Sequence, residues 1–560
     1  MILQSLRDLA LREHLLSNPG YEPKAVAWII DVGEGGKFLG LVPTGEGKRL
    51  NIPMRNGRTV DNSPDFLVDK SEYVLGICRQ EQLQKPRKAE VLAKRQRLFR
   101  DALVAAHEHT GLGSLKAVID FLADGEERGR CAAAVHAVGY KNNDLFAFRY
   151  HSELVHDIPE VQGYFSRWRA RSTELSAQCL VCGQTRAPVD KHRGIRVPGG
   201  TTSGVALVSF NSDAFESFGL SRNENAPVCR PCADSYTTAL NRCLDPKYVD
   251  QAGNVLPRRS VRLCSDTAAV YWAEKDAPLV DLFGSLLDAP TEDAVRGLFL
   301  SPHQGQEPAS LKDARFFCLL ISGGQGRATL RGLHTQTLGT AEDNVREYFR
   351  IVDTGQDAPL PLWVLLRSLA LQGKTDNLPP NLAADFFLAI LFGRQFPRVV
   401  ISGAVTRCRA ERKVTRERAA ILRACLIRNY RLEVTVSLDK DNTEPGYRLG
   451  RLLAVLERLQ GDAQRSLNKT IVDRFYGAAS TRPATVFPSL IRLAQHHLAK
   501  VDSPGFHQMN LGQVLDGIAA FPPTLRLDEQ GLFALGYYHQ RQEFFRPREA
   551  EPQAQTGEQQ

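Results

Sequence analysis

The 560-residue sequence lacks a long uninterrupted hydrophobic run. A helix that crosses a membrane needs about 20 mostly apolar residues, whereas the run FFLAILF from Phe386 has only the length of a buried helix. The first residues also lack the apolar core of a signal peptide, because Arg7, Asp8, Arg12 and Glu13 interrupt the leucines. We therefore expect an amphipathic first helix and a cytoplasmic protein without a membrane segment.

The sequence also lacks the motifs of several enzyme classes. It contains no Walker loop, no nucleophile elbow and no nuclease core of paired carboxylates with a lysine. Its eleven cysteines form an odd, scattered set rather than a disulfide framework. These absences favour a binding protein over an enzyme.

The composition is that of an ordinary soluble protein, with 43% hydrophobic and 24% charged residues. The length exceeds what one hydrophobic core supports, so several domains are expected. The predicted fold is α+β and multidomain, with mixed N-terminal and middle domains and a helical C-terminal bundle. The predicted ranges are an N-terminal α+β domain at 1–115, a mixed α/β middle region at 116–395, the bundle at 396–546 and a disordered tail at 547–560.

Local patterns predict several elements within these ranges. In the bundle, leucines at three- and four-residue spacing predict one buried helix face; they are Leu449, Leu452, Leu453, Leu456 and Leu459. Turn residues and apolar runs predict the other elements. These are strands at 25–32 and 37–43, a basic helix at 86–110, a strand at 205–211, a helix at 234–244, a strand–turn–strand unit at 314–333 and a strand at 433–439.

Four cysteines form the sharpest local motif. Cys179 and Cys182 make one C-x-x-C pair, and Cys229 and Cys232 make a second pair after 46 intervening residues. Two such pairs supply four thiolates to one tetrahedral ion, which predicts a structural zinc site. The alternative is two unrelated buried cysteine pairs; a redox role is disfavoured because neither pair opens a thioredoxin-like unit.

Basic residues are concentrated in particular segments of the chain. Between Arg79 and Arg100 there are eight Lys and Arg against two Glu, and between Arg394 and Arg431 there are eleven against two. Such density attracts a polyanion such as nucleic acid, although any single run can also be a solvated helix face. Residues at 43–64 are expected to form a long basic loop that reads duplex DNA, or else a solvated hairpin loop. Its candidate contacts are Lys48, Arg49, Asn51, Arg55, Asn56, Arg58 and Asn62.

Two further segments are candidates for contacts to a nucleic-acid backbone. Arg327 and Arg331 flank a Gly-rich turn, whose N–H groups can bind a phosphate, although a plain hairpin is equally consistent. The densest basic run is expected to contact a strand or a guide RNA, or to be a solvated helix. It contains Arg407, Arg409, Arg412, Lys413, Arg416 and Arg418.

Six sequence blocks, in order along nearly the whole chain, carry a family resemblance. They are SPDFLVDKSEYVLGI from Ser63, VSFNSDAFESFG from Val208, ISGGQGRATLRG from Ile321, PPNLAADFFLAILFGRQFPRVV from Pro379, and the C-terminal runs from Tyr447 and Glu529. The set resembles the Csd family, the large subunit of type I-C CRISPR effector (Cascade) complexes. One departure is that Gly323, Gly324 and Gln325 replace the family's usual Pro-Asn-Ala.

The resemblance implies a non-catalytic DNA-recognition subunit of an RNA-guided complex. Its expected partners are other Cascade subunits, crRNA, double-stranded target DNA and a helicase-nuclease. It would read the protospacer-adjacent motif and aid duplex opening, while base pairing reads the remaining sequence. The alternatives are a metal-dependent nuclease and a stand-alone zinc-containing DNA-binding regulator.

The family also implies that the helical C-terminal part is made separately by internal initiation. The sequence has only three methionines, Met1, Met54 and Met509. A start at Met509 would leave a fragment too short for the bundle, and a start at Met54 would keep nearly the whole chain, so a non-AUG start between about 395 and 440 is expected. The candidate positions are Val399, Val400, Val405 and Val434.

Overall fold

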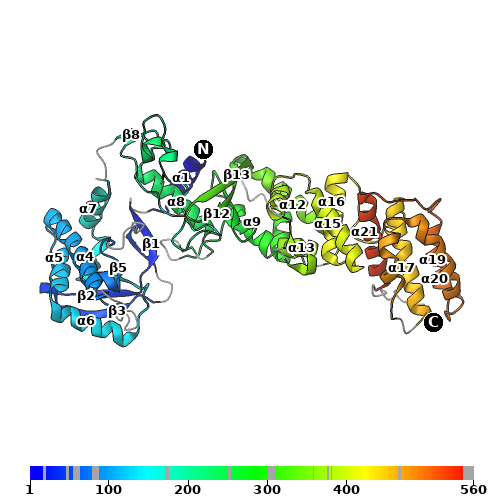
Figure 1. The fold of residues 1–560 in the computed structure, drawn as a ribbon, viewed down its shortest axis with the longest axis horizontal. Coiled ribbons are helices and arrows are strands. Elements are labelled where there is room, and N and C mark those ends of the chain that lie inside the picture. Colours follow the sequence, from blue (N-terminus) through cyan, green and yellow to red (C-terminus); the bar gives the residue numbers. More distant parts are fainter. Residues whose placement is uncertain are drawn as a thin grey trace, which may run out of the picture. The chain divides into compact units, whose positions relative to one another are not determined.

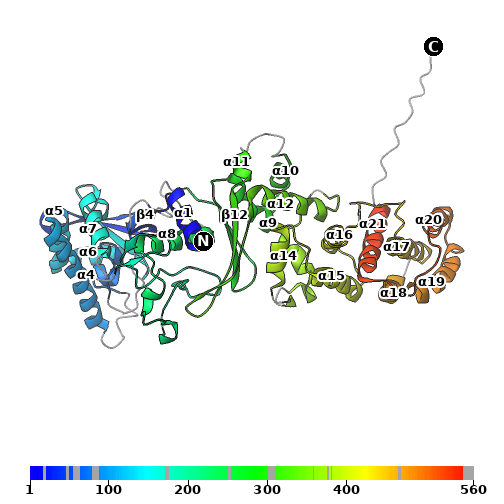
Figure 2. The same cartoon turned by 90° about the horizontal axis from the view of Figure 1, so that it is seen from above.

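The computed structural model in Figures 1 and 2 contains two compact units. The first comprises Met1–Asp276 and Phe317–Thr335, and the second Ala277–Phe316 and Gln336–Gln560. The structure describes residues 1–16, 20–45, 49–54, 63–78, 88–170, 176–210, 212–246, 248–249, 254–300, 309–356, 358–374, 377–379, 381–464 and 468–545. The predicted tail at 547–560 lies outside these residues.

In its described residues, the first unit combines helices with four small sheets. Its helices are α1 (Ile2–Arg12), α2 (Ser71–Val74), α4 (Lys88–Thr110), α5 (Gly113–Ala123), α6 (Gly125–Val138), α7 (Pro159–Ala170) and α8 (Arg230–Leu244). Its strands are β1 (Tyr21–Ala25), β2 (Trp28–Val32), β3 (Phe38–Pro43), β4 (Arg49–Pro53), β5 (Asp69–Lys70), β6 (Leu145–Tyr150), β7 (Glu153–Leu154), β8 (Ala177–Gln178), β9 (Thr185–Arg186), β10 (Ser260–Arg262), β11 (Thr267–Ala273), β12 (Arg315–Gly323) and β13 (Ala328–Thr337).

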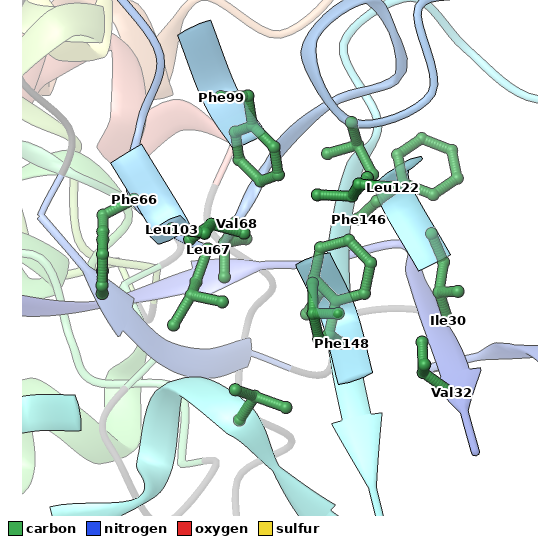
Figure 3. Close-up of a cluster of buried hydrophobic side chains, with 14 of the residues drawn as sticks. Ile30, Val32, Phe66, Leu67, Val68, Phe99, Leu103, Leu122, Phe146 and Phe148 are labelled. Carbon is green, nitrogen blue, oxygen red and sulfur yellow. The ribbon is translucent and has the colours of Figure 1, made fainter. Parts of the chain in front are cut away.

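The N-terminal part of the first unit is built on a five-stranded sheet of order β3-β2-β6-β5, with β7 paired to β6. The predicted hairpin is confirmed, because β2 and β3 pair antiparallel across a turn in which Gly35 and Gly36 have positive φ. Strand β6 runs parallel to β2. Figure 3 shows the core between this sheet and the helices, with Phe99, Phe146 and Phe148 fully buried. The basic helix predicted at 86–110 is α4 in this layer.

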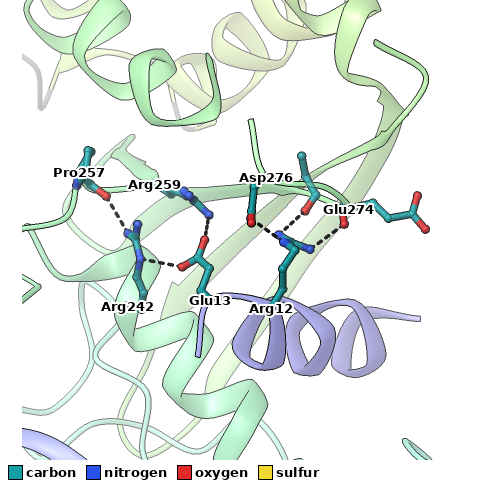
Figure 4. A network of polar contacts seen from close by, with 8 residues as sticks. Arg12, Glu13, Arg242, Pro257, Arg259, Glu274 and Asp276 are labelled. Atoms are coloured by element: carbon teal, nitrogen blue, oxygen red, sulfur yellow. Dashed lines mark hydrogen bonds and ion pairs between the residues drawn. The ribbon is translucent and has the colours of Figure 1, made fainter. Parts of the chain in front are cut away.

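A second core in the first unit joins α1 and α8 to the four-stranded sheet of order β10-β11-β12-β13. Figure 4 shows how α1 is held there: Glu13 accepts from the side chains of Arg242, at 3.2 Å, and Arg259. On the same helix, Arg12 donates to Asp276 and to the carbonyl of Glu274, each at 2.6 Å. Charge-assisted hydrogen bonds to residues far along the chain therefore hold the first helix in place.

The second unit is helical in its described part. Its helices are α9 (Pro278–Asp288), α10 (Glu292–Leu300), α11 (Ala309–Lys312), α12 (Leu338–Val352), α13 (Leu362–Leu369), α14 (Leu382–Leu391), α15 (Arg398–Glu411), α16 (Arg416–Tyr430), α17 (Pro445–Ala463), α18 (Ile471–Ala479), α19 (Pro483–Leu498), α20 (Gly505–Leu515) and α21 (Leu527–Phe544). The α+β prediction with a helical C-terminal part is confirmed. The break between the two units falls inside the range 116–395, which we expected to form one region.

Helices α17 and α21 pack closely against each other in the bundle. The predicted leucine face of α17 is buried as expected, with Leu449, Leu452 and Leu459 all fully inaccessible. The two backbones meet at glycines: a Cβ added at Gly450 would lie 2.0 Å from the carbonyl oxygen of Phe533. Every residue of α21 from Gly531 to Gln540 is buried, and this helix also packs on α15 and α16.

Two predicted strands are wrong. At 433–439 the carbonyls of Val434 and Thr435 both accept from the guanidinium of Arg423 at 3.1 Å, so a side chain takes the place of a neighbouring strand. At 205–211 the described residues form only isolated bridges, from Val205 to Ile195 and from Ala206 to Arg327. A run of residues with high β propensity therefore does not form a strand unless another strand offers an edge for it to pair with.

The predicted long loop at 43–64 is also wrong in its described part. Arg49–Pro53 is strand β4, which pairs antiparallel with β1. Its partner register places Ile52, fully buried, opposite Glu22. Ile52 is buried in the N-terminal core and Leu50 packs against that core, which explains why a segment rich in turn residues becomes a strand.

Candidate metal centre and basic surfaces

The four cysteines of the two C-x-x-C pairs meet in the first unit. Cys179 and Cys182 lie in the turn between the paired strands β8 and β9, and Cys229 and Cys232 lie at the start of α8. Their four Sγ atoms all lie within 4.8 Å of one another. Four sulfur donors at this separation can hold one metal ion, and a tetrahedral set of four thiolates is typical of zinc or iron.

The backbone around the sulfurs is arranged to stabilise thiolates. In the first turn Gly183, at φ +72°, donates its N–H to the carbonyl of Cys179 at 2.8 Å. The Sγ of Cys179 accepts from the backbone N–H groups of Val181 at 3.4 Å and Cys229 at 3.3 Å. Cys229 is the N-cap of α8, where the helix dipole favours negative charge.

The thiols of the cysteine cluster affect one another's pKa values. A hydrogen bond with Cys232 lowers the pKa of Cys229 to about 5, and the same interaction together with burial raises the pKa of Cys232. The sulfurs of Cys182 and Cys229 lie 3.7 Å apart. One thiolate can be stabilised by the neighbouring thiols, but four thiolates in this space require a cation. The chemistry of the site therefore fits a metal ion.

The Gly-rich turn between β12 and β13 does not offer the N–H groups that we expected to bind a phosphate. Gly323 donates to the carbonyls of Pro198 and Asp266, both at 3.0 Å, and Gly324 donates to Arg327 at 3.0 Å. Gly326 donates within the same turn. The N–H groups of these three glycines therefore already donate to carbonyls of the chain, and the prediction that they bind a phosphate is wrong.

The two arginines beside this turn also have partners within the chain. The guanidinium of Arg327 lies over the ring of Phe215, at 4.1 Å from its centroid, and donates to the carbonyl of Ser209. Arg331 donates to the hydroxyl of Ser322 at 3.1 Å and lies 3.7 Å from the carboxylate of Asp266. Both arginines thus bind neighbouring segments of the chain next to β13. Their role in binding nucleic acid stays a prediction.

The densest basic run does not form one helix. Helix α15 ends at Glu411 and is followed by Arg412, whose φ of +55° is left-handed; α16 begins at Arg416 under a Thr415 cap. Arg409, Arg412 and Lys413 are exposed. We name these three residues the basic turn, because they gather at the end of α15 and in the turn that follows it.

The other members of the basic run face other parts of the protein. Arg416 donates to the Thr354 hydroxyl at 2.9 Å, and Arg418, which is buried, donates to Glu411 at 2.6 Å. Arg407 is largely covered, 4.0 Å from Glu411. The expected continuous basic helix surface is therefore reduced to the basic turn.

Two further arginines of this segment, Arg423 and Arg428, are buried and contribute to stability rather than to a charged surface. Arg423 donates to the carbonyls of Arg350 and Ile351, each at 2.9 Å, at the end of α12. Arg428 donates to the Ala389 carbonyl at 2.9 Å and lies over the ring of Phe396. Burial lowers the pKa of both guanidiniums. Both arginines donate to carbonyls that a helix end leaves without a partner, and Arg428 also makes a cation–π contact with its aromatic neighbour.

The predicted DNA-reading loop is only partly described. Arg49 and Asn51 lie in strand β4, and the Arg49 guanidinium is 3.9 Å from the carboxylate of Asp245. The other predicted contacts lie outside the described residues; they are Lys48, Arg55, Asn56, Arg58 and Asn62.

A basic cavity was not predicted from the sequence. It has a volume of about 440 Å³ in the first unit, and Arg196, Arg258 and Arg262 are among its lining residues together with Thr201 and Ser260. Among the described residues that line it, none carries a carboxylate. Two of the arginines come from the run PRRSVR at 257–262, which was a signal, whereas the contribution of Arg196 depends on the fold.

In the part of the chain that the structure describes, no helix has the length and apolar character needed to span a membrane. No curated protein matches this sequence. The family model described as CRISPR-associated protein (Cas_Csd1) matches residues 4–545, which is nearly the whole chain. The chain that carries this cysteine cluster and these basic surfaces thus belongs to the Csd1 family of CRISPR-associated proteins.

Proposed function

We propose that the chain is the non-catalytic DNA-recognition subunit of a type I-C RNA-guided interference complex in the cytoplasm. In this role it reads the protospacer-adjacent motif, aids duplex opening and recruits the helicase-nuclease, in company with other Cascade subunits and crRNA. The observation that carries the proposal is the family match over residues 4–545. The basic turn and the basic cavity support it, since both present positive charge suited to a nucleic-acid backbone.

The absence of catalytic activity is part of this proposal. Among the described residues, the cysteine cluster is the one group of His, Cys, Asp or Glu side chains close enough to hold a metal. Nucleases that use two metal ions need clustered carboxylates for this purpose. Purified chain incubated with Mg²⁺ or Mn²⁺ and DNA should leave the DNA intact, whereas cleavage would support the nuclease alternative.

We further propose that the cysteine cluster holds a structural zinc ion, with Cys179, Cys182, Cys229 and Cys232 as ligands. The closed set of four thiolates leaves no position for a substrate, so zinc there would act on stability and not on chemistry. It would join the turn between β8 and β9 to the start of α8.

The central test of the proposed function uses the complex assembled with crRNA. Its affinity is measured for matched duplexes that differ only in the sequence beside the target. Arg55→Ala should weaken binding to all duplexes, because a lost phosphate contact is independent of sequence, while Asn56→Ala should reduce the preference between flanking sequences. Arg49→Ala tests whether a residue of β4 takes part. No preference in the wild-type complex, or duplex-specific binding by the chain without RNA, would contradict the proposal.

The basic turn gives a separate prediction for single-stranded nucleic acid. Arg412→Ala/Lys413→Ala in the full chain should weaken binding of a fluorescein-labelled single strand roughly tenfold at moderate salt, and should reduce the magnitude of the slope of log affinity against log salt by about 1 to 2. Fluorescence anisotropy over a salt series measures both effects.

The matched control for the basic turn is Arg492→Ala/Lys500→Ala, which removes two exposed cations from another part of the same unit. The control should leave both the affinity and the slope close to wild type. Equal losses in the two double variants would show that net charge alone, rather than the basic turn, determines binding.

A further inference from the structure

A short exposed segment before the second cysteine pair carries apolar side chains on its surface. We name residues 212–225 the aromatic arm; within it, residues 212–222 are all exposed. Phe218 has an exposure of 101%, and Phe215 and Leu220 are 41% and 42% exposed. A fully exposed phenylalanine is unusual, because burying such a side chain is strongly favourable.

The tip of the aromatic arm is held in one conformation. The side-chain oxygen of Asn225 accepts from the N–H and the hydroxyl of Ser217, both at 3.1 Å. Its amide nitrogen donates to the carbonyls of Leu220, at 2.9 Å, and Arg222, at 3.0 Å. One side chain therefore closes the turn that presents Phe218, and this turn does not depend on apolar packing.

The backbone of Phe218 is left-handed, with φ of +54°. This conformation is disfavoured for a bulky L side chain and is easily adopted by glycine. A phenylalanine at this position thus combines an unfavourable backbone with an unburied ring. Residues that keep such a conformation cluster at binding sites, where the strain belongs to a prearranged shape.

The base of the arm is fastened to the rest of the first unit. Asn223 is buried and donates to the carbonyl of Pro188 at 3.4 Å and to the Asp190 carboxylate at 3.3 Å. On the other side, Arg327 lies over the Phe215 ring. The arm is therefore a fixed projection whose base is next to the cysteine cluster in sequence.

The charge of the arm decides between two kinds of partner. Residues 212–225 contain Asp213, Glu216 and Glu224 against Arg222, so three negative charges and one positive charge give a net charge of −2. A negative projection is repelled by a phosphate backbone, which disfavours nucleic acid. It is attracted by a protein surface with a positive rim.

We propose that Phe218 is an anchor residue that inserts into an apolar, positively rimmed pocket of another protein subunit of the complex. This inference rests on the proposed function, since it supplies the contact by which the chain joins its partners. A single aromatic side chain in a closed pocket commonly dominates the affinity of an interface, and a prearranged anchor avoids the entropic cost of ordering a loop on binding.

The test compares Phe218→Gly with wild type in the full chain, co-expressed with the other protein subunits of a type I-C Cascade complex. Glycine removes the ring and relieves the left-handed backbone. The melting temperature of the isolated variant should therefore rise by about 1 to 4 °C, while its dissociation constant for the partner subunits should increase at least about 30-fold. Val255→Ala, which shortens another exposed apolar side chain of the same unit, is the control and should change neither quantity.

A second variant tests the positive rim. Asp213→Lys/Glu216→Lys changes the net charge of the arm from −2 to +2. It should slow association and reverse the sign of its dependence on salt, without changing the melting temperature appreciably. Wild-type affinity in Phe218→Gly would overturn the inference. So would normal assembly combined with slower duplex opening, measured with a fluorescent base analogue, because Phe218 would then act on bases. A wild-type complex that assembles through Phe218 but shows no flanking-sequence preference would contradict the proposed function alone.

Discussion

Serine in place of Cys229 is expected to unfold the core around α8 and to release the metal. Cys229 is one of the four proposed ligands and stands at the N-cap position of α8, so the loss of this ligand affects the metal site and the start of the helix together. Structural zinc contributes on the order of 10 kcal/mol to small zinc-dependent folds at neutral pH, although a domain with its own apolar core loses less. We expect the variant to lose about one equivalent of zinc by elemental analysis and to lose at least about 3 kcal/mol of stability.

The control for this substitution is Cys264→Ser. Cys264 is exposed and its thiol donates to the Asp266 carboxylate at 2.9 Å, a bond that a serine hydroxyl can also make. This variant should keep its zinc and its melting temperature. Chelation of the wild-type protein should reproduce the effect of Cys229→Ser, since a hollow of about 430 Å³ borders the turn that carries Cys179 and Cys182. Metal-free protein with an unchanged melting curve would contradict the zinc assignment.

Alanine at Gly450 is expected to separate α17 from α21. The added Cβ would lie 2.0 Å from the Phe533 carbonyl oxygen and 2.8 Å from the Tyr537 backbone nitrogen. Both atoms belong to the backbone of α21, so no side-chain rotation relieves the overlap. Forced separation of two well-packed helices costs about 3 kcal/mol or more, in addition to the buried leucine contacts that open with it.

Helix α17 also contains the matched control for this substitution. A Cβ added at Gly461 has no described atom within 4 Å, so alanine meets no neighbour there. Gly461→Ala should stabilise the protein by up to about 1 kcal/mol, because alanine has the higher helix propensity. Urea unfolding of both variants measures the opposite signs. A destabilisation by Gly461→Ala equal to that of Gly450→Ala would indicate that helix flexibility, not the close approach, is responsible.

The difference between these two glycines illustrates what the sequence could predict. The leucine spacing predicts the buried face of α17 because periodicity is a property of one segment. The approach of Gly450 to Phe533 joins two segments far apart in the chain, and a glycine within a helix by itself indicates only a weaker helix. The cysteine cluster was predictable because two C-x-x-C pairs carry their own geometry.

The basic residues show the opposite case. A count of charges between Arg394 and Arg431 predicts a polyanion-binding surface, but Arg418, Arg423 and Arg428 are buried. Their partners are carbonyls of distant segments, such as those of Ile351 and Ala389. An arginine has five N–H donors and can serve either a phosphate or the ends of helices, so charge alone does not distinguish the two.

The burial of α21 on all sides has a consequence for any shorter product of this gene. Its residues from Gly531 to Gln540 need cover from α15 and α16 as well as from α17. A polypeptide that begins at Val434 would lack both α15 and α16 and would present a bare apolar surface, which promotes aggregation. One that begins at Val399 or Val400 would retain α16 and nearly all of α15. A soluble C-terminal fragment should therefore start at the beginning of α15.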